Sequence, residues 1–423
     1  MDTREKKFYV GIDLGEEYSQ VSYYNCIDAE PVSVDFGTDS TECRVPTVVG
    51  KTIGRDEWFA GDEAIHGASL GEVIAVDGLL KKAADKNPVT VDKVSVMPVR
   101  LIAGYLDYLI QAAKLAGESD TADRVCITLE NYNISVLNVL LKALNSIGYQ
   151  DDAIEFAGRD ESFIYYAISQ KNELWKNDVF LFDYSNKGLI VKHMYTVNER
   201  GSRIIMVHTD DMSDEVTDAM RRNKASEEYL DSRLKETAVK LFEYHNISTV
   251  YLTGEAFAAE FNTPSFIGYI CDRRRVFAGD NLYCKGACYQ AVAADYPPDR
   301  DIIVACKERI TTGIEIRISD RGRDKIFRLV RPGINWFGAD CSYDFILDGA
   351  EEAELFLSPI DAREKQLIRI SFAELPVRPD KATRITISFS FTSDSRCHMM
   401  VKDKGFGEFY KSSGRVINEE LLL

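Results

Sequence analysis

The chain has 423 residues, of which 45% are hydrophobic and 28% are charged, and this even mixture excludes a disordered or fibrous protein. The formal net charge of −17, with dispersed lysines and arginines, predicts no nucleic-acid partner, because like charges repel the phosphates. The amino terminus carries no apolar signal segment and no apolar run is long enough to cross a bilayer, so we expect a soluble, cytoplasmic protein with no membrane partner.

The chain opens with a predicted β-hairpin. Residues 8–15 and 18–25 alternate in the manner of two antiparallel strands, and Gly15 begins the turn between them. Pro98 then opens a helix whose apolar stripe continues to residue 113. The spacing of that stripe indicates a helix packed on a core.

The middle of the chain predicts a β-α unit and a second hairpin. Residues 124–129 read as a buried strand, and the helix over 136–147 ends at Gly148, because glycine accepts the left-handed conformation of a helix end. Residues 178–185 and 188–197 form the second predicted hairpin. The sequence therefore predicts a second hairpin like the one at the amino terminus.

A change in the predicted secondary structure, from alternating helices and strands to short strands alone, marks a domain boundary. The α/β pattern ends near residue 294, and we assign residues 1–295 to a first domain. The Pro-rich, charged stretch that follows predicts a linker over 296–307. Residues 308–423 contain short strands with turn signals and no helix before the last few residues. This pattern predicts an all-β second domain.

The cysteines and histidines indicate a reducing compartment and no metal site. Nine cysteines are spread along the chain without a C-x-x-C pair, as is typical of reduced thiols in a cytosol. The histidines are far apart in sequence and none has a partner at the spacing of a metal motif: His66, His193, His208, His245 and His398. The sequence therefore predicts no metal centre.

The order of these elements resembles the actin, sugar-kinase and heat-shock ATPase superfamily. GIDLGEEYSQV is similar to the first phosphate loop of the seventy-kilodalton heat-shock chaperones, residues 125–149 to their conserved strand and helix, and residues 281–292 to their closing helix. Residues 375–414, with the turn Asp403-Lys404-Gly405, resemble their substrate-binding strands, and we expect no counterpart of the family's helical lid. The resemblance implies a two-lobed α/β actin-like ATPase fold followed by an all-β sandwich.

The resemblance also implies a nucleotide pocket between the two hairpins. It assigns Asp13 and Asp183 as catalytic residues that orient magnesium-bound water. The other residues that it places at this vestigial pocket are Gly11, Gly15, Glu16, Lys187, Gly188, Gly254 and Glu255.

Several positions depart from the family pattern. Glu16 and Glu17 stand where the family has threonines, and a carboxylate about 4 Å from a phosphate charge costs on the order of 4 kcal/mol at an effective dielectric constant near 20. Residues 184–187 replace a glycine run in the second hairpin. Glu255 replaces a glycine of the adenosine segment, and residues 159–162 replace an acid-Pro-Thr-Ala-Ala motif. These departures predict weak or absent ATP binding.

We therefore expect a chaperone-like module that binds a protein or peptide on a degenerate ATPase scaffold, with no required cofactor. The alternative is an active magnesium-dependent ATPase in which Asp13 and Asp183 hold magnesium and Lys187 replaces amide donors. A filament-forming, actin-like protein is disfavoured by the β domain. The expected groove lies near the turns at 338–340 and 348–350, whereas Phe345 and Leu347 are expected in the core.

Overall fold

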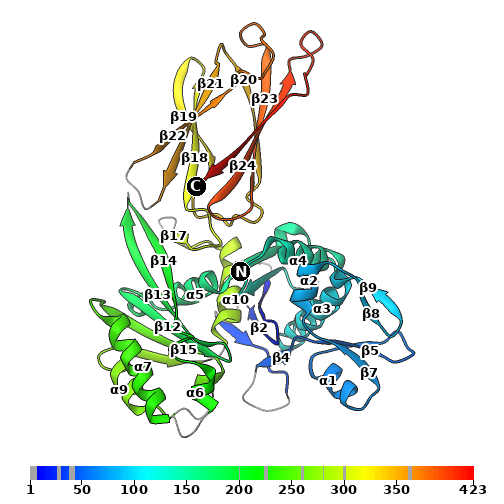
Figure 1. The fold of residues 1–423 in the computed structure, drawn as a ribbon, viewed down its shortest axis with the longest axis vertical. Coiled ribbons are helices and arrows are strands. Elements are labelled where there is room, and N and C mark those ends of the chain that lie inside the picture. The colour runs from blue at the N-terminus through cyan, green and yellow to red at the C-terminus, as the bar shows by residue number, and fades with distance from the viewer. Residues whose placement is uncertain are drawn as a thin grey trace, which may run out of the picture. The chain divides into compact units, whose positions relative to one another are not determined.

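The computed structural model describes residues 7–25, 30–37, 43–199, 201–222, 227–258, 262–279, 281–298, 302–360 and 364–423. The chain divides into two compact units (Figure 1). The first unit comprises Met1–Thr196 and Val207–Arg300, and the second comprises Val197–Met206 and Asp301–Leu423. Residues 299–301 of the predicted linker lie outside the described residues. The rest of that linker is not all irregular, because Ile302–Ala305 forms strand β17.

The first sheet of unit 1 is built around a fully buried strand. Its order is β11-β10-β1-β2-β3, and β4 also pairs with β2. Strands β1 and β2 are antiparallel and form the predicted hairpin, while β1 and β10 run parallel. The bounds are β1 Phe8–Leu14, β2 Tyr18–Asn25, β3 Pro31–Ser33, β4 Arg44–Pro46, β10 Arg124–Leu129 and β11 Ile154–Gly158.

Four helices accompany this sheet: α3 Pro98–Ala116, α4 Ile134–Ser146, α5 Arg159–Ile168 and α10 Leu282–Asp295. Pro98 occupies the first turn of α3, and Gly148 has a φ of 105°, so both predicted helix limits have the expected physical cause. Helix α10 packs against both β1 and α5. A Cβ on Gly11 would lie 2.2 Å from the backbone nitrogen of Cys288, so this close approach requires glycine.

The second sheet of unit 1 has the order β16-β15-β12-β13-β14. Strands β12 and β13 form the second predicted hairpin, and its buried side chains belong to a large hydrophobic cluster that includes Phe180, Phe182 and Phe266. The strands are β12 Asp178–Ser185, β13 Gly188–Glu199, β14 Ser202–Asp211, β15 Ile247–Thr253 and β16 Arg275–Ala278. The helices are α6 Asp218–Arg222, α7 Glu227–Phe242, α8 Glu255–Ala258 and α9 Pro264–Ile270.

A smaller part of unit 1 lies between β4 and α3 in the sequence. It contains a three-stranded sheet, β6-β5-β7, a two-stranded sheet, β8-β9, and two helices. Their bounds are β5 Val49–Thr52, β6 Trp58–Ala60, α1 Gly61–Ser69, β7 Val73–Val76, α2 Leu79–Asp85, β8 Val89–Val91 and β9 Val94–Val96.

Unit 2 is built from two four-stranded sheets, β19-β18-β21-β22 and β20-β23-β24-β25, whose neighbouring strands are all antiparallel. The bounds are β18 Thr312–Asp320, β19 Arg323–Val330, β20 Cys341–Leu347, β21 Glu352–Pro359, β22 Gln366–Ser371, β23 Thr383–Phe391, β24 Arg396–Gly405 and β25 Val416–Leu422. The last residues are therefore a strand and not a helix, because pairing with β24 outweighs local helix propensity.

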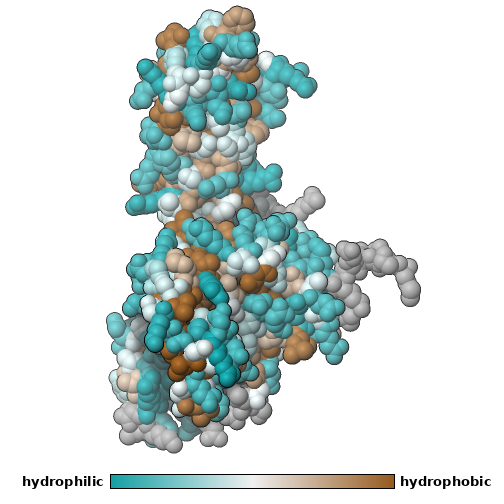
Figure 2. Space-filling model, turned by 90° about the vertical axis from the view of Figure 1, so that its right-hand side faces the viewer, coloured by the Kyte–Doolittle hydropathy of each residue, from teal (hydrophilic) through white to brown (hydrophobic). Residues whose placement is uncertain are grey.

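Unit 2 also contains β17, which pairs in parallel with Arg203–Met206 of β14. Residues Val197–Met206, which the sequence places in the first domain, thus belong to the second unit. Within the described residues, no helix has the length and apolar character needed to cross a membrane. On the face shown in Figure 2, hydrophilic residues predominate and hydrophobic residues are scattered among them.

Candidate functional site

A cavity of about 160 Å³ in unit 1 is lined by the turns of both hairpins. The β1–β2 turn contributes Gly15 and Glu16, and the β12–β13 turn contributes Ser185 and Lys187. The end of β15 adds Gly254. Segments that are far apart in sequence therefore meet at one site.

Arg159, the first residue of α5, occupies the centre of this site. Its Nη2 lies 3.1 Å from Oδ2 of Asp13, and its Nη1 lies 3.8 Å from Glu130 and 3.9 Å from Asp183. The guanidinium also lies over the ring of Tyr283, 4.8 Å from its centre. A cationic side chain thus stands between the two aspartates that the sequence assigns to magnesium.

The surroundings keep Arg159 charged and Tyr283 protonated. Burial acts to lower the pKa of Arg159, but the carboxylates of Asp13 and Asp183 outweigh burial and raise that pKa above its ordinary value. The hydroxyl of Tyr283 donates to Oδ2 of Asp183 at 2.8 Å. Burial and the charge of Asp183 raise the pKa of Tyr283 well above its ordinary value, so this hydroxyl remains a donor.

The rim of the cavity is held by contacts between its two hairpins and their neighbours. Nδ2 of Asn186 donates to Oε2 of Glu17 at 3.2 Å, which joins the two hairpin turns directly. Nζ of Lys187 donates to Oε2 of Glu130 at 2.6 Å. Burial would raise the pKa of Glu130, but Arg159 and Lys187 outweigh it and lower that pKa.

Glu255, expected in the adenosine part of the pocket, is paired with cations of the protein. Nη1 of Arg44 lies 3.0 Å from its Oε1, and Nη2 of Arg221 lies 3.8 Å from its Oε2. The carboxylate is about a third exposed. It therefore faces the cavity as part of an ion-pair network.

These residues do not fit a bound magnesium nucleotide. Small-molecule pockets usually have about 300–1,000 Å³, and this cavity is smaller. Arg159 takes the position between Asp13 and Asp183 that a metal would need. The cavity is lined by six carboxylates and three cations. The carboxylates are Asp13, Glu16, Glu17, Glu130, Asp183 and Glu255, and the cations are Arg44, Arg159 and Lys187. A polyphosphate would meet net repulsion here, and we assign no hydrolytic step to these residues.

A second cavity, of about 820 Å³, lies within unit 2. Apolar side chains of both sheets line it: Ile316, Ile318, Phe345, Leu347, Ile385 and Ile387. Asp348 and Ala350 also line it, whereas Gly338, Ala339 and Asp340 do not. One of the two predicted groove turns thus borders the cavity. Phe345 and Leu347 are half-buried cavity residues, not core residues, because the end of β20 faces the space between the sheets.

Comparison with protein families follows the division of the chain. Residues 30–307 match the C-terminal region of a family of unknown function, DUF5716, and this match spans more than half of the 423 residues. The protein belongs to the DUF5716 family. Residues 309–423 match a domain of unknown function, DUF8552. A search of curated proteins finds no match to the chain. Asp183, Lys187 and Glu255 lie within the DUF5716 match, and Asp13 and Gly15 precede it.

Seven of the predicted pocket residues line the cavity in unit 1: Asp13, Gly15, Glu16, Asp183, Lys187, Gly254 and Glu255. Gly11 and Gly188 do not line it, and their assignment to the pocket is corrected. Gly11 faces α10, where a side chain would clash with Cys288. Gly188 has a φ of 102°, and its Cβ would lie 2.7 Å from Cβ of Ser213, so it is required by the hairpin turn.

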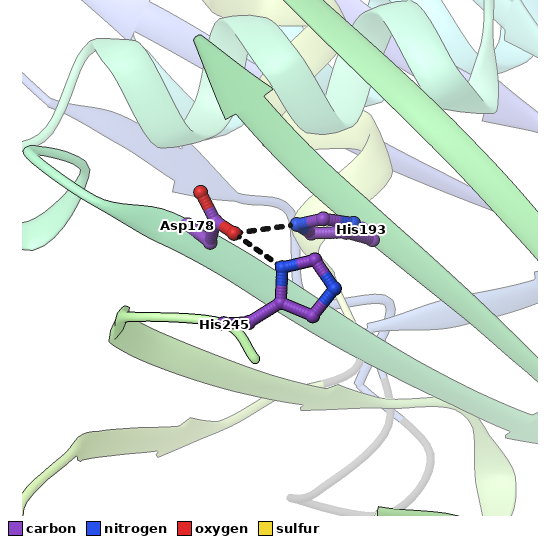
Figure 3. A group of neighbouring side chains, drawn as sticks. All are labelled: Asp178, His193 and His245. Carbon is purple, nitrogen blue, oxygen red and sulfur yellow. Dashed lines mark hydrogen bonds and ion pairs between the residues drawn. The ribbon is translucent and has the colours of Figure 1, made fainter. Parts of the chain in front are cut away.

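Sequence reasoning missed the residues that close the site. In the sequence, Arg159 stands out only as a departure from the family's acid-Pro-Thr-Ala-Ala motif. The signal that could have identified it is that a cation replaces an acid in the pocket to which the resemblance also assigns Asp13 and Asp183. No local pattern marks Tyr283, which reaches Asp183 from α10. Sequence spacing also did not indicate that His193 and His245 meet in space at Asp178 (Figure 3).

Proposed function

We propose that the protein is a chaperone-like module that binds a protein or peptide segment in unit 2, with an actin-like unit 1 as a scaffold of little or no ATP hydrolysis. The observation that carries this proposal is the apolar-lined cavity between the sheets of unit 2. Its size lies within the usual range of ligand pockets, about 300–1,000 Å³. We further propose the cytoplasm as its location, on the basis of the cysteine pattern.

The cavity has the chemistry expected for an extended peptide with apolar side chains. Isoleucine, leucine and phenylalanine side chains supply an apolar surface, as in other peptide grooves that receive alternate side chains of an extended segment. Charged side chains also border it: Arg317, Arg321, Asp344, Asp348, Glu352, Glu354 and Lys381. Charged residues at the rim can hydrogen-bond to the polar backbone of a peptide, while the apolar residues of the cavity contact its side chains.

The network around Arg159 supports a scaffold role for unit 1. The alternative, an active ATPase, needs magnesium at Asp13 and Asp183, and this requires Arg159 to leave both carboxylates. Nothing in the geometry of the described residues favours the filament alternative. We therefore retain peptide binding without nucleotide turnover.

The test is fluorescence anisotropy with a labelled nine-residue peptide that has a central Leu-Leu-Val segment, compared with a peptide in which Ser-Ser-Thr replaces this segment. We expect only the apolar peptide to bind. Ile318→Ser should weaken its binding about tenfold, because a buried apolar contact of about 1.5 kcal/mol is lost. Ile326→Ser is the matched control, since Ile326 is exposed on the neighbouring strand and does not line the cavity.

Equal binding of both peptides, or an equal effect of both substitutions, would reject the cavity as the binding site. Thermal unfolding with and without magnesium-ATP tests the scaffold role separately. A ligand at 100 times its dissociation constant adds about 2.7 kcal/mol of stability. We expect no shift in melting temperature at millimolar ATP, and a clear shift would favour the ATPase alternative.

A further inference from the structure

We propose that Asp178, His193 and His245 form a binding site for a zinc-class divalent cation in unit 1. The three side chains come from separate elements: Asp178 begins β12, His193 lies on β13, and His245 lies in the turn between α7 and β15. Figure 3 shows both imidazoles directed at the same carboxylate. The site is separate from the cavity around Arg159 and from the proposed peptide site.

The ligand atoms already converge. Nε2 of His193 lies 3.0 Å and Nδ1 of His245 lies 2.8 Å from Oδ2 of Asp178. All three ligand atoms lie within 4.8 Å of one another. Around a tetrahedral zinc ion, ligand atoms at about 2.0–2.1 Å from the metal are separated by about 3.3 Å. The two N···O distances are therefore within about half an ångström of those around a zinc ion.

Backbone contacts hold the three elements in place. The N–H of Asp178 donates to the carbonyl of Asn246 at 3.0 Å, which fixes the turn that carries His245 beside the start of β12. The N–H of His245 donates to the carbonyl of Phe242, the last residue of α7. A metal would thus bind a cluster whose backbone is already ordered, and little conformational entropy would be lost.

Aromatic packing orients His193. Its ring stacks on Phe180 with centroids 4.4 Å apart and planes 7° from parallel, while the ring of His245 meets it edge-on at 4.4 Å. Phe180 belongs to the buried core of this half of unit 1. The two imidazoles are therefore supported on one side by the core, as metal ligands usually require.

The donor set has the chemistry of a zinc site. Neutral imidazole nitrogens and ionised carboxylate oxygens are common zinc ligands. Two imidazole nitrogens and one carboxylate oxygen favour zinc over magnesium or calcium, which prefer oxygen ligands. Side-chain exposures of 25% for Asp178 and 35% for His245 leave the fourth position open to water.

The experiment is isothermal titration of the full-length protein with zinc chloride, after treatment with EDTA and in the presence of a phosphine reductant. We expect one site at micromolar zinc or below, with proton release on binding and weaker binding as the pH falls below about 6.5, where imidazoles protonate. His245→Gln should weaken binding at least about tenfold, because even outer-shell partners of metal ligands contribute about 10–100-fold. His66→Gln removes an exposed imidazole of α1 and should change nothing.

Asp178→Asn and Co²⁺ provide the second readout. Co²⁺ bound by the wild-type protein should show the intense visible absorption of a tetrahedral complex, and Asp178→Asn should lose it while still melting cooperatively in EDTA. If Asp178→Asn does not fold, His245→Gln decides, since His245 lies in an exposed turn. The absence of zinc binding by the wild-type protein, or equal affinity of wild type and His245→Gln, would overturn the proposal. The latter result would place the zinc at other ligands of the chain.

Discussion

Arg159 neutralises carboxylates that come from three separate segments of unit 1. Asp13 and Asp183 are both less than a tenth exposed, so they depend on this cation and on the hydroxyl of Tyr283 for compensation of their charge. A buried ion pair adds little net stability, but the loss of one partner leaves a buried, uncompensated charge. The structural importance of Arg159 therefore exceeds what its contact distances alone suggest.

Arg159→Ala should lower the free energy of unfolding by about 3–5 kcal/mol, the usual cost of breaking a buried pair. Millimolar magnesium should recover part of this loss, because the vacated space is bordered by three carboxylates and hard cations bind oxygen ligands. Urea denaturation with and without magnesium measures both effects.

The control for this substitution is Arg55→Ala. Arg55 and Glu57 form an exposed pair at 3.9 Å, with side-chain exposures of 72% and 57%. An exposed pair contributes at most about 1 kcal/mol. Equal losses for Arg55→Ala and Arg159→Ala would contradict the central role of Arg159.

We expect Asp403 to make unit 2 sensitive to acid. Arg378 donates two hydrogen bonds to its carboxylate, at 2.7 and 2.8 Å, and the backbone N–H groups of Gly405 and Ser413 donate as well. The Arg378 hydrogen bonds, followed by those of Ser413 and Gly405, hold the pKa of Asp403 well below its ordinary value. A lowered folded-state pKa stabilises the fold above the unfolded pKa of about 3.9, and that contribution is lost as the pH falls toward the folded value.

Asp403→Asn should therefore lower the melting temperature of unit 2 at pH 7, and its difference from the wild-type protein should shrink as the pH falls below about 4. Melting temperatures between pH 2 and 7 provide the measurement. Asp320→Asn, at an exposed pair with Lys325, is the control and should leave the curve unchanged. A difference that stays constant with pH would mean that the carboxylate charge of Asp403 is not responsible.

At the scale of elements, the contact of α10 with β1 brings both Asp13 and Tyr283 to Arg159. The contact depends on the absence of a side chain at Gly11, because the helix backbone at Cys288 occupies that space. Glycine at a strand interior normally weakens the strand. Here it allows the helix to approach the strand.

Gly11→Ala should destabilise unit 1 by about 1–3 kcal/mol or more, the usual cost of overpacking a core. Gly104→Ala is the matched control, because a Cβ at Gly104 in α3 meets no atom within 4 Å. That substitution should stabilise the helix by up to about 1 kcal/mol. Chemical denaturation of both variants tests the contrast, and similar effects of the same sign would refute the close approach at Gly11.

The sequence predicts both hairpins, and it also predicts α3, which begins at Pro98, and α4, which ends before Gly148. These elements are predictable because hydrophobic periodicity and the backbone preferences of proline and glycine are local signals. Strand β25 was not, because its pairing with β24 is a tertiary contact. The short strands β6 to β9 were not predicted, since three or four residues carry too little periodicity.

The same distinction holds for the candidate site. Asp13 and Asp183 were assigned through the resemblance to the heat-shock ATPases, and both line the cavity. Arg159 lies 146 residues from Asp13, and β14, α6 and α7 separate His193 from His245 in the sequence. Contacts of this kind follow from the tertiary arrangement of elements, and no sequence spacing encodes them.

At the scale of the whole molecule, the chain enters unit 2 twice. Val197–Met206 enters first, and Asp301–Leu423 returns to it, so β17 pairs with Arg203–Met206 across about a hundred intervening residues. Ile204 and Ile205 are buried in this arrangement. A cut at the predicted domain boundary would therefore separate two paired strands.

A chain that ends at residue 300 should self-associate, because the backbone of Arg203–Met206 becomes an unpaired edge with buried isoleucines beside it. A chain that ends at residue 307 keeps β17 and should remain closer to the full-length protein in size. Size-exclusion chromatography distinguishes the two. Identical elution of both truncated chains would show that β17 does not protect this edge.

The cation that compensates Asp13 and Asp183 is covalently part of the chain. A tethered cation has a fixed local concentration, so it cannot be diluted, chelated or exchanged with the cellular pool of magnesium. In the proposed function, nucleotide turnover would then not control when the bound segment is released. A bound segment would leave at its own dissociation rate, and the occupancy of the protein would follow the abundance of its partner and not the energy supply of the cell.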